Sequence, residues 1–238
     1  MTLGGQVAIV TGAGRGIGRA VAHALAREGV AVALAARTRQ ELAAVAAEIR
    51  EGSGRALAVP TDVTQDAAVE ALVEQTVAEL GRVDLLVTAA GVAAFGPVGA
   101  SKPDDWDAML AVNLRATMVC CRAVLPAMTR QRRGTIVNVA SIAATRAIAG
   151  AAAYSASKAG VVAFSRVLAE EVRGDGIRIG VILAGATDTP LWDTIPNAPD
   201  RARMLRPEDV ARAVVLMAAL PPRASLEEVT LLPAGGIL

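Results

Sequence analysis

A glycine-rich turn near the N-terminus joins a short apolar run to a helix-length stretch. The run covers residues 6–11 and is rich in β-branched side chains, the turn covers residues 12–18 (Gly-Ala-Gly-Arg-Gly-Ile-Gly), and the helical stretch covers residues 19–28. Glycines allow a close approach of the backbone to a pyrophosphate, and a helix start offers unpaired N–H groups to that anion. This order predicts a nucleotide site. The spacing Gly-x3-Gly-x-Gly differs from the common G-x-G-x-x-G pattern, so an ordinary loop is the alternative.

Apolar runs and helix-length stretches alternate along the rest of the chain. The further runs cover residues 30–36, 55–60, 83–88, 135–140, 177–183 and 228–232, and the helical stretches cover residues 40–51, 65–80, 105–130, 151–173 and 207–220. Such alternation predicts a parallel sheet with right-handed crossovers, and ligands beyond the carboxyl ends of the strands. We therefore expect one α/β domain over residues 1–238, with a doubly wound, seven-stranded parallel sheet and helices on both faces.

Hydrophobic residues make up 53% of the chain, and its mean hydropathy is +0.45. The excess comes mainly from alanine and valine, and runs such as residues 213–220 are far shorter than the ~18 apolar residues of a membrane span. We expect a soluble protein that does not interact with membranes. Residues 1–5 carry no basic region followed by an apolar one, so we expect no secretory signal and a cytoplasmic location.

Charge and metal-ligating residues exclude other classes of partner. The net charge of +1 comes from interspersed signs, which leaves no basic surface for nucleic acid. Cys120 and Cys121 are adjacent in a helical stretch, where they cannot easily form a disulfide, and they fit a reducing compartment. His23 is the single histidine and has no partner in the sequence pattern. We expect no metal site and a small-molecule substrate.

The second strand ends where a dinucleotide's adenosine ribose is expected, and a carboxylate there selects a free 2′-hydroxyl. Here no carboxylate appears, and the strand runs into Arg37-Thr38-Arg39. With Arg15 in the glycine turn, two or three guanidiniums can converge on a 2′-phosphate. This favours NADP over NAD. The alternative is that Arg37 and Arg39 only solvate the next helix.

Small and polar residues follow the third and fourth strands. Asp62 is placed either to accept a hydrogen bond from an adenine amino group or to cap the helix over residues 65–80, and we predict capping as its main energetic role. Ala89, Ala90 and Gly91 are small enough to let a ribose and a nicotinamide pass closely.

Tyr154 is the single tyrosine of the chain, and Lys158, four residues later, is one of two lysines. On a helix this spacing stacks the two side chains on one face. Two unit charges ~4 Å apart at an effective dielectric constant of ~20 interact by about 4 kcal/mol, which is roughly 3 pH units. We therefore expect Lys158 to lower the pKa of Tyr154 enough for proton transfer near neutrality. The alternative is a solvated pair on a helix surface.

Four motifs in this order resemble the short-chain dehydrogenase/reductase family: Thr11-Gly12-x3-Gly16-x-Gly18, Asn113, Ser141 and Tyr154-x3-Lys158. The resemblance covers nearly the whole chain and implies a Rossmann fold and a hydride transfer with NADP(H). It implies that Tyr154 is the general acid or base, that Lys158 binds the nicotinamide ribose, and that Ser141 holds the substrate oxygen. It also implies that Asn113 anchors a water in a proton relay. From its position alone, Ser141 can donate to a substrate carbonyl, but a serine after a strand is more often an ordinary turn or cap residue.

The glycine turn, the strand ends and the resemblance together give the expected cofactor-binding residues. They are Gly12, Arg15, Gly16, Ile17, Gly18, Arg37, Thr38, Asp62, Val63, Ala90, Gly91, Tyr154, Lys158, Gly185, Thr187 and Thr189.

Two loops depart from the pattern of the family. Thr88-Ala89 stands where the family usually has two asparagines, so that side-chain bracing of this turn is reduced to what the Thr88 hydroxyl supplies. Ala184 stands where proline is usual before Gly185. We expect a less rigid cofactor site that is still active.

The expected function is the NADPH-dependent reduction of a ketone or aldehyde, with the reverse oxidation possible. Residues 187–206, with Trp192, and the loop with Phe95 are expected to wall the substrate pocket. The pattern does not separate a 3-oxoacyl carrier-protein reductase from a hydroxy acid or sugar alcohol dehydrogenase. Basic residues at positions 130, 132 and 133 either dock an acidic carrier protein or solvate a helix end.

Two further expectations concern association and catalysis. The apolar faces of residues 105–130 and 151–173 are wider than one sheet contact needs, so we expect a homo-oligomer, either a tetramer or a dimer. A non-catalytic NADP(H) sensor or scaffold is the alternative function, because two loops depart from the family pattern.

Overall fold

The computed structural model describes residues 3–195 and 198–237 and contains a seven-stranded parallel sheet in the order β3-β2-β1-β4-β5-β6-β7. The strands are β1 (Val7–Thr11), β2 (Ala31–Ala36), β3 (Ala56–Pro60), β4 (Leu85–Thr88), β5 (Gly134–Val139), β6 (Ile177–Ala184) and β7 (Glu228–Leu231). The five strands from β1 to β6 other than β3 are almost wholly buried, which is typical of a parallel sheet covered on both faces. The predicted fold class is therefore confirmed.

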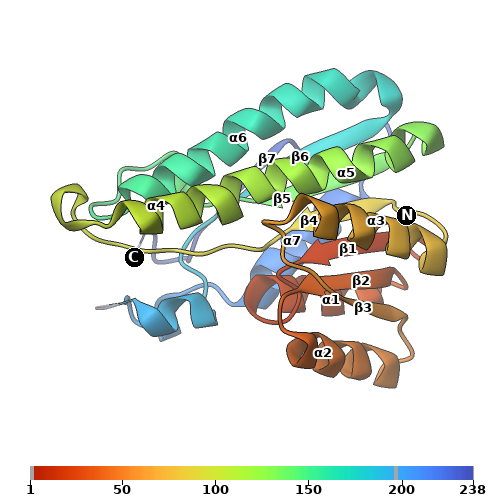
Figure 1. The fold of residues 1–238 in the computed structure, drawn as a ribbon, viewed down its shortest axis with the longest axis horizontal. Coiled ribbons are helices and arrows are strands. Elements are labelled where there is room, and N and C mark those ends of the chain that lie inside the picture. The colour runs from red at the N-terminus through yellow and green to blue at the C-terminus, as the bar shows by residue number, and fades with distance from the viewer. Residues whose placement is uncertain (1–2, 196–197, 238) are drawn as a thin grey trace.

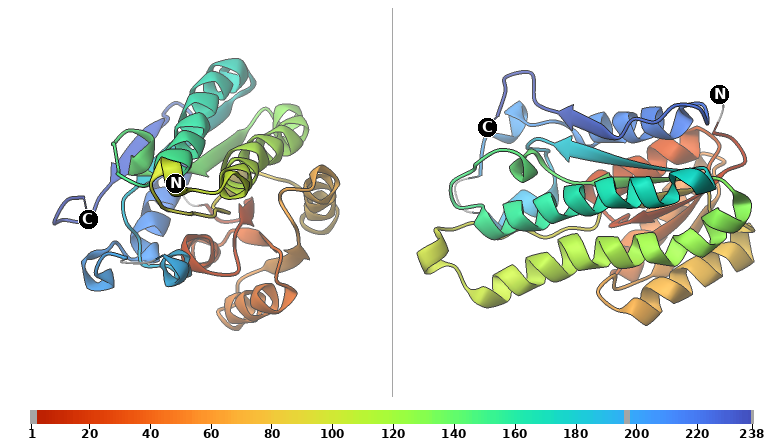
Figure 2. Two further views of the ribbon diagram at one scale, coloured as in Figure 1. Left: turned by 60° about the vertical axis from the view of Figure 1, so that its left-hand side comes forward. Right: turned by 90° about the horizontal axis from the view of Figure 1, so that it is seen from above.

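The described chain contains seven α-helices, and all except α4 cover the two faces of the sheet (Figures 1 and 2). They are α1 (Gly16–Arg27), α2 (Arg39–Glu51), α3 (Asp66–Leu80), α4 (Pro103–Met109), α5 (Ala116–Gln131), α6 (Ala152–Val172) and α7 (Pro207–Ala219). One apolar core packs α1, α2 and α7 against the sheet, and a second packs α3, α5 and α6 against the opposite face. The sheet thus has the three-layer arrangement of a Rossmann fold.

The strand order places a crevice at the carboxyl ends of β1 and β4. The chain proceeds from β1 outward to β3, and then returns to place β4 on the other side of β1. Ligands in open α/β sheets bind at such a reversal point. The register brings Thr11, Thr88 and Asn138 into one row across β1, β4 and β5. The loops that follow these strands therefore meet in one place.

The predicted helix over residues 105–130 contains a π-helical segment, Leu110–Arg115, between α4 and α5. π-Helical turns occur frequently at functional sites because they displace one residue from the regular face. The joined stretch Pro103–Gln131 is also long and apolar enough, by length and composition, to cross a bilayer. Its inner face packs on the sheet through residues such as Cys121 and Met128, as expected of a core helix.

Candidate active site

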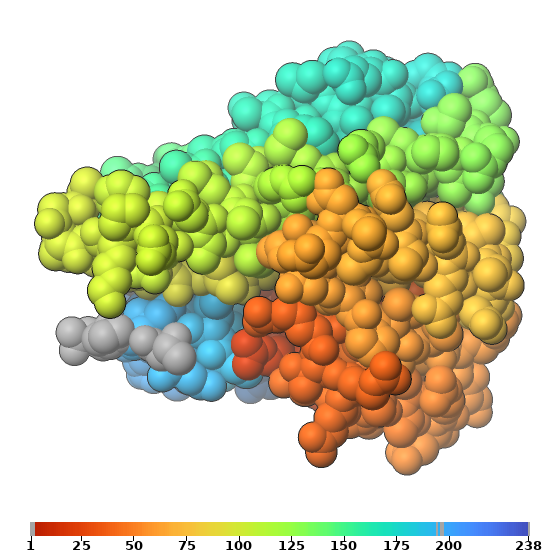
Figure 3. All heavy atoms as spheres, in the orientation of Figure 1, coloured from red at the N-terminus to blue at the C-terminus, as the bar shows by residue number. Residues whose placement is uncertain are grey.

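A cleft of about 430 Å³ lies at the carboxyl ends of the strands. It extends from the glycine turn after β1 to the start of α6 and the segment after β6. Figure 3 shows this last segment (blue) below α4 (yellow-green) and beside the N-terminal part of the chain (red). The volume is in the range of about 300–1,000 Å³ that is usual for small-molecule sites.

Most of the residues that we expected to bind the cofactor line this cleft. They are Gly12, Arg15, Gly16, Ile17, Arg37, Thr38, Asp62, Val63, Ala90, Gly91, Tyr154, Lys158, Gly185, Thr187 and Thr189. Gly18 is instead buried inside α1, where a Cβ would overlap the carbonyl group of Gly12. Arg39 is the first residue of α2 and does not line the cleft, so the predicted convergence reduces to Arg15 and Arg37. Residues 196 and 197 of the expected substrate segment lie outside the described residues.

Two glycines of the turn have no room for a side chain. Gly12 has a φ of +67°, and a Cβ there would lie 2.9 Å from the backbone of Ala89 and Ala90. Gly16 has a φ of +55°, and a Cβ there would lie 3.2 Å from the methyl group of Thr189. Both positions require glycine because of backbone conformation and space. The turn leads directly into α1, whose first two residues line the cleft, and a helix start has unpaired N–H groups.

Side chains brace the turn after β4. The Thr11 hydroxyl accepts hydrogen bonds from the backbone N–H groups of Ala89 (3.1 Å) and Ala90 (3.2 Å). The Thr88 hydroxyl donates to Asn138 Oδ1 at 2.7 Å, and the Asn138 amide donates to the Ser165 hydroxyl at 2.9 Å. All these donors and acceptors are buried or partly buried. The bracing, which we expected to be reduced to what the Thr88 hydroxyl supplies, is therefore supplemented by Thr11.

The loop after β6 is also held in place. The Gly185 N–H donates to the Leu231 carbonyl at 2.8 Å, and the Thr187 hydroxyl donates to the Gly185 carbonyl at 3.0 Å. The Trp192 indole N–H donates to the Thr187 carbonyl at 2.9 Å. A proline at position 184 is therefore not needed to fix this loop.

Tyr154 and Lys158 both line the cleft from the first turns of α6. The Lys158 ammonium is buried and donates to the Val139 carbonyl at the end of β5, at 2.9 Å. It lies 5.9 Å from the centroid of the Tyr154 ring. Ser141 is buried two residues after β5, and its hydroxyl accepts a hydrogen bond from the Ala143 N–H at 3.1 Å. Ser141 is thus a cap of the short helix Ile142–Ala144 and a residue of the cleft at the same time.

The expected direction of the tyrosine shift is wrong for this structure. Burial raises the pKa of Tyr154 above its ordinary value, and hydrogen bonding with the Ser141 hydroxyl lowers it by less. Burial also lowers the pKa of Lys158 to about 8. Charge attraction favours a phenolate beside an ammonium, but removing both groups from water disfavours their charged forms. Desolvation is the larger effect at this site.

Asn113 braces the neighbouring loop from the π-helical segment. Its side chain is fully buried, its amide donates to the Val92 carbonyl and to the Ser157 hydroxyl, and its Oδ1 accepts from the Val92 N–H. A Cβ at Gly91 would lie 3.4 Å from Asn113 Oδ1 and 3.8 Å from the Lys158 ammonium. Asn113 is therefore next to the site, and the relay water remains a prediction.

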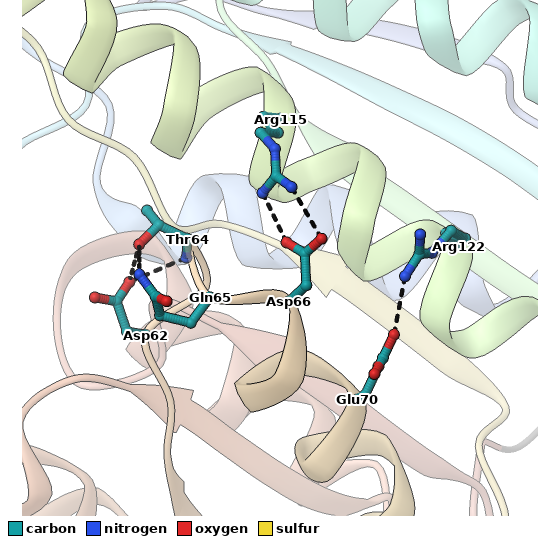
Figure 4. Close-up of polar contacts among 7 residues, drawn as sticks. All are labelled: Asp62, Thr64, Gln65, Asp66, Glu70, Arg115 and Arg122. Atoms are coloured by element: carbon teal, nitrogen blue, oxygen red, sulfur yellow. Dashed lines mark hydrogen bonds and ion pairs between the residues drawn. The ribbon is translucent and has the colours of Figure 1, made fainter.

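Asp62 does not cap the following helix, so that prediction is wrong. Its carboxylate accepts hydrogen bonds from the Thr64 N–H (3.0 Å) and the Thr64 hydroxyl (2.7 Å), while α3 begins after Gln65 (Figure 4). The pKa of Asp62 is lowered most by the hydrogen bond from the Thr64 N–H and next by the one from the Thr64 hydroxyl. The nearby charge of Arg37 lowers this pKa further. Asp62 and Arg37 thus face the same end of the cleft.

Ion pairs fasten α3 beside the π-helical segment and α5. Arg115 makes a bidentate pair with Asp66 at 2.7 and 2.9 Å, and Arg122 pairs with Glu70 at 2.9 Å (Figure 4). These pairs are exposed, so each contributes little stability. The Arg115 pair is made with the first residue of α3, four residues after Asp62.

Glu41 is a residue of this site that the sequence did not predict. It lies in the first turn of α2 and lines the cleft with Arg15 and Arg37. A Cβ at Gly14 would lie 2.6 Å from its carboxylate oxygen, so this carboxylate covers the glycine turn. No carboxylate directly follows the second strand, as the sequence shows, but this one reaches the cleft from α2. Because α2 begins at Arg39, its first turn places Glu41 on the same side as Arg37, and both residues line the cleft.

The opposite end of the cleft has an apolar wall. Phe95 lies 5.6 Å from Tyr154 in an edge-to-face arrangement and 6.0 Å from Trp192 in a stacked one, measured between ring centroids. Ile148 and Leu191 are further apolar residues that line the cleft. The two loops that we expected to enclose the substrate thus contact each other.

The basic residues considered for carrier docking lie far from the cleft. Arg130 and Arg133 are exposed at the end of α5 and the start of β5, at the amino edge of the sheet. Arg132 pairs with Asp175 at 3.0 Å. Their position fits a solvated helix end. Among the described residues, His, Cys, Asp and Glu form no group of three that would suit a metal ion.

Comparisons with known proteins agree with this architecture. A family model described as short chain dehydrogenase matches residues 6–200. The chain is 38% identical over 226 residues to a D-threitol dehydrogenase of Mycolicibacterium smegmatis, covering 91% of this chain and 87% of that protein.

Two solved structures are similar along nearly the whole chain. A metagenomic short-chain oxidoreductase in complex with NADP has a TM-score of 0.86 and 37% identity, covering 98% of this chain and 99% of that one. An alcohol dehydrogenase from the archaeon Thermococcus sibiricus, complexed with 5-hydroxy-NADP, has a TM-score of 0.88 and 30% identity, covering 96% and 97%. The fold, the family model and these relatives agree, and the chain belongs to the short-chain dehydrogenase family.

Proposed function

We propose that this protein is an oxidoreductase that transfers a hydride between NADP(H) and a carbonyl or secondary alcohol. The observation that carries the proposal is that Ser141, Tyr154 and Lys158 line the same cleft as the glycine turn. The glycine turn fits a dinucleotide, because Gly12 and Gly16, both at positive φ, let the turn pack closely against Ala89, Ala90 and Thr189 and lead into the start of α1 at the cleft. When bound, the nicotinamide supplies the hydride.

The protein's residues supply orientation and a proton. The Ser141 hydroxyl donates a hydrogen bond to the substrate oxygen, and the Tyr154 hydroxyl transfers the proton to or from that oxygen. Lys158 holds a ribose hydroxyl with its ammonium group. A general acid in carbonyl reduction is protonated at the working pH, as an ordinary tyrosine is; burial raises the pKa of Tyr154 further, which keeps its hydroxyl protonated but makes it a weaker acid.

NADP is the proposed cofactor, rather than NAD. Arg15 and Arg37 line the end of the cleft beside the glycine turn, where they offer two guanidinium groups to a 2′-phosphate. The two similar structures with NADP or 5-hydroxy-NADP support this choice. Glu41 opposes it in part, because its carboxylate lies at the same end. The expected selectivity is therefore moderate.

The alternative of a non-catalytic NADP(H) sensor or scaffold is no longer supported by the observation that suggested it. It depended on weakened loops after β4 and β6, and both are held by hydrogen bonds from Thr11, Thr88 and Thr187. The similarity to a D-threitol dehydrogenase supports alcohol and carbonyl chemistry instead.

The test is the loss of NADPH absorbance across a panel of carbonyl compounds, with the wild type and with Tyr154→Phe. We expect Tyr154→Phe to lower turnover by about 10²–10⁴-fold, because it removes the transferred proton, and to leave the NADPH dissociation constant within a factor of about two. Ser155→Ala, on the next residue of α6, is the control and keeps full activity. Turnover that survives in Tyr154→Phe would disprove the assigned role.

We also propose a homo-oligomer, a tetramer or a dimer, in the cytoplasm. Leu110, Met118 and Val167 are exposed on the π-helical segment, α5 and α6, which lie side by side on one face (Figures 1 and 2). Apolar side chains gathered on an exposed face favour association. Burial raises the pKa of the Cys120 thiol to about 12, which fits an unreactive cysteine in a reducing compartment. Light scattering that gave the 24.2 kDa mass of one chain would contradict the oligomer.

A further inference from the structure

The substrate end of the cleft gathers three of the five aromatic residues of the chain, Phe95, Tyr154 and Trp192. They come from three separate segments: the loop after β4, the start of α6 and the short helix Pro190–Thr194 after β6. The chain is only 2% aromatic. Their convergence therefore makes this end of the cleft unlike the rest of the molecule.

The wall presents ring surface rather than hydrogen-bonding groups. The indole N–H of Trp192 is already used by the Thr187 carbonyl at 2.9 Å, which also fixes the plane of the ring. Phe95 stacks on that ring with an interplanar angle of 19° and meets the Tyr154 ring edge-on. Ile148 and Leu191 add aliphatic surface beside them. A flat apolar group can pack on such a fixed surface with little loss of side-chain freedom.

Charges are distributed unevenly among the described lining residues. Arg15, Arg37, Glu41 and Asp62 all lie toward the glycine turn and the ends of β2 and β3. At the substrate end, the charged lining group in the described chain is Lys158, whose ammonium donates to the Val139 carbonyl and, in the proposed function, also to a ribose hydroxyl of the cofactor. An anionic substrate there would lose its hydration without gaining a free cation. A short polyol would leave several hydroxyl groups without partners against the aromatic wall.

From these contacts we infer that the substrates are uncharged ketones that carry a ring next to the carbonyl carbon, in preference to short polyols and to carboxylated ketones. The carbonyl oxygen lies toward Ser141 and Tyr154, and the ring packs on Trp192, Phe95 and Ile148. This inference rests on the proposed function, because it takes the Ser141 and Tyr154 end of the cleft as the reaction site.

Binding without turnover tests the inference directly. The protein is saturated with NADP⁺, which cannot reduce a ketone, and the affinities of acetophenone, erythrulose and acetoacetate are measured by titration calorimetry. We expect acetophenone to bind at least about tenfold more tightly than the other two, because each buried methylene-sized part of the ring adds about a factor of four. Erythrulose or acetoacetate binding as tightly as acetophenone would overturn the inference.

Two variants locate the ring. Trp192→Ala is expected to weaken acetophenone binding at least about tenfold while changing erythrulose binding less than twofold. Trp106→Ala, which removes a tryptophan of α4 outside the cleft lining, is the matched control and leaves both affinities unchanged. Ile148→Asp places a charge on an exposed rim residue, where it does not threaten folding, and is also expected to weaken acetophenone binding. Unchanged acetophenone affinity in Ile148→Asp and in a folded Trp192→Ala would overturn the inference.

Turnover separates this inference from the proposed function. NADPH oxidation with erythrulose but not acetophenone would uphold the oxidoreductase and disprove the ring-bearing substrate. Tight acetophenone binding without NADPH oxidation by any ketone would uphold the apolar site and disprove the oxidoreductase.

Discussion

The two ends of the cleft differ in how they use charge. Beside the glycine turn, Arg37 is exposed to water, and it shares that end with Glu41 and Asp62. At the proposed reaction end, the ammonium of Lys158 is buried and lies near the Tyr154 ring and the Val139 carbonyl. Exposed charges are screened and can select a ligand at small cost, whereas a buried charge costs stability and acts strongly on its neighbours. The end of the cleft where we propose that the cofactor phosphate binds is thus exposed to water, and the end where we propose the proton transfer is buried.

The largest effect should come from the reaction end. Lys158→Met removes the buried cation while keeping an unbranched side chain of similar length, so we expect turnover to fall by about 10²–10³-fold, because the ammonium both binds and stabilises charge next to Tyr154. Lys102→Met changes the other lysine, which is exposed before α4, and is the control. Steady-state kinetics with NADPH measure both variants. Retained turnover in Lys158→Met would show that the buried charge is not needed.

The same pair of variants tests the cost of burying that charge. The pKa of Lys158 is lowered from 10.5 to about 8 by burial, so that between these pH values the unfolded chain binds more protons than the folded one. The free energy of unfolding of the wild type should therefore rise with pH across this interval, by up to about 3 kcal/mol relative to Lys158→Met. Lys102→Met should follow the wild type. Denaturant titrations at pH 7, 8.5 and 10 measure the difference, and parallel curves for wild type and Lys158→Met would contradict it.

An intermediate effect is expected at the exposed end. Arg37→Asp replaces a cation by an anion where we place the 2′-phosphate, so the NADPH dissociation constant should rise about 30- to 100-fold, or about 2–3 kcal/mol, and NADH should bind more tightly. Arg39→Asp makes the same change of charge just outside the cleft lining and should alter either constant by less than about threefold, because water and salt screen it. Equal affinities of the wild type for NADPH and NADH would defeat this assignment.

The smallest effect concerns the carboxylate that covers the glycine turn. Glu41→Gln keeps the shape of the side chain and removes its negative charge, so NADPH should bind about threefold more tightly, with a smaller change for NADH. Glu51→Gln, at the exposed end of α2, is the control. Fluorescence titration of the reduced cofactors measures the ratio. If Glu41→Gln weakens NADPH binding, the carboxylate supports the site instead of opposing it.

The fold was predictable because its signals are local. The apolar run before Gly12 and the alternation of strands and helices depend on neighbouring residues, and they indicated every strand of the observed sheet. The spacing of Tyr154 and Lys158 likewise needed only the geometry of a helix, and both line the cleft. Short-range regularities were therefore sufficient for the architecture and for bringing Tyr154 and Lys158 to the same cleft.

The remaining features of the site depend on distant contacts. Glu41 lies 2.6 Å from the position of a Cβ on Gly14 because α2 packs beside the glycine turn, which no local pattern reveals. The Asp62 carboxylate could accept hydrogen bonds either from Thr64 or from the N–H groups at the start of α3, and in the structure it accepts them from Thr64. The raised pKa of Tyr154 depends on all the atoms around the phenol, whereas the sequence pointed to one neighbouring cation. These outcomes are set by tertiary packing.

Because the cleft holds the single tyrosine of the chain, spectroscopy of this protein has an unusually simple readout. A sample grown with tyrosine labelled with carbon-13 at the ring carbon that bears the hydroxyl contains one enriched phenol, so its nuclear magnetic resonance spectrum reports the ionisation of the site with no background from other tyrosines. The same solitary ring makes nitration by tetranitromethane a site-directed modification, and its protection by a bound ligand is a direct measure of occupancy.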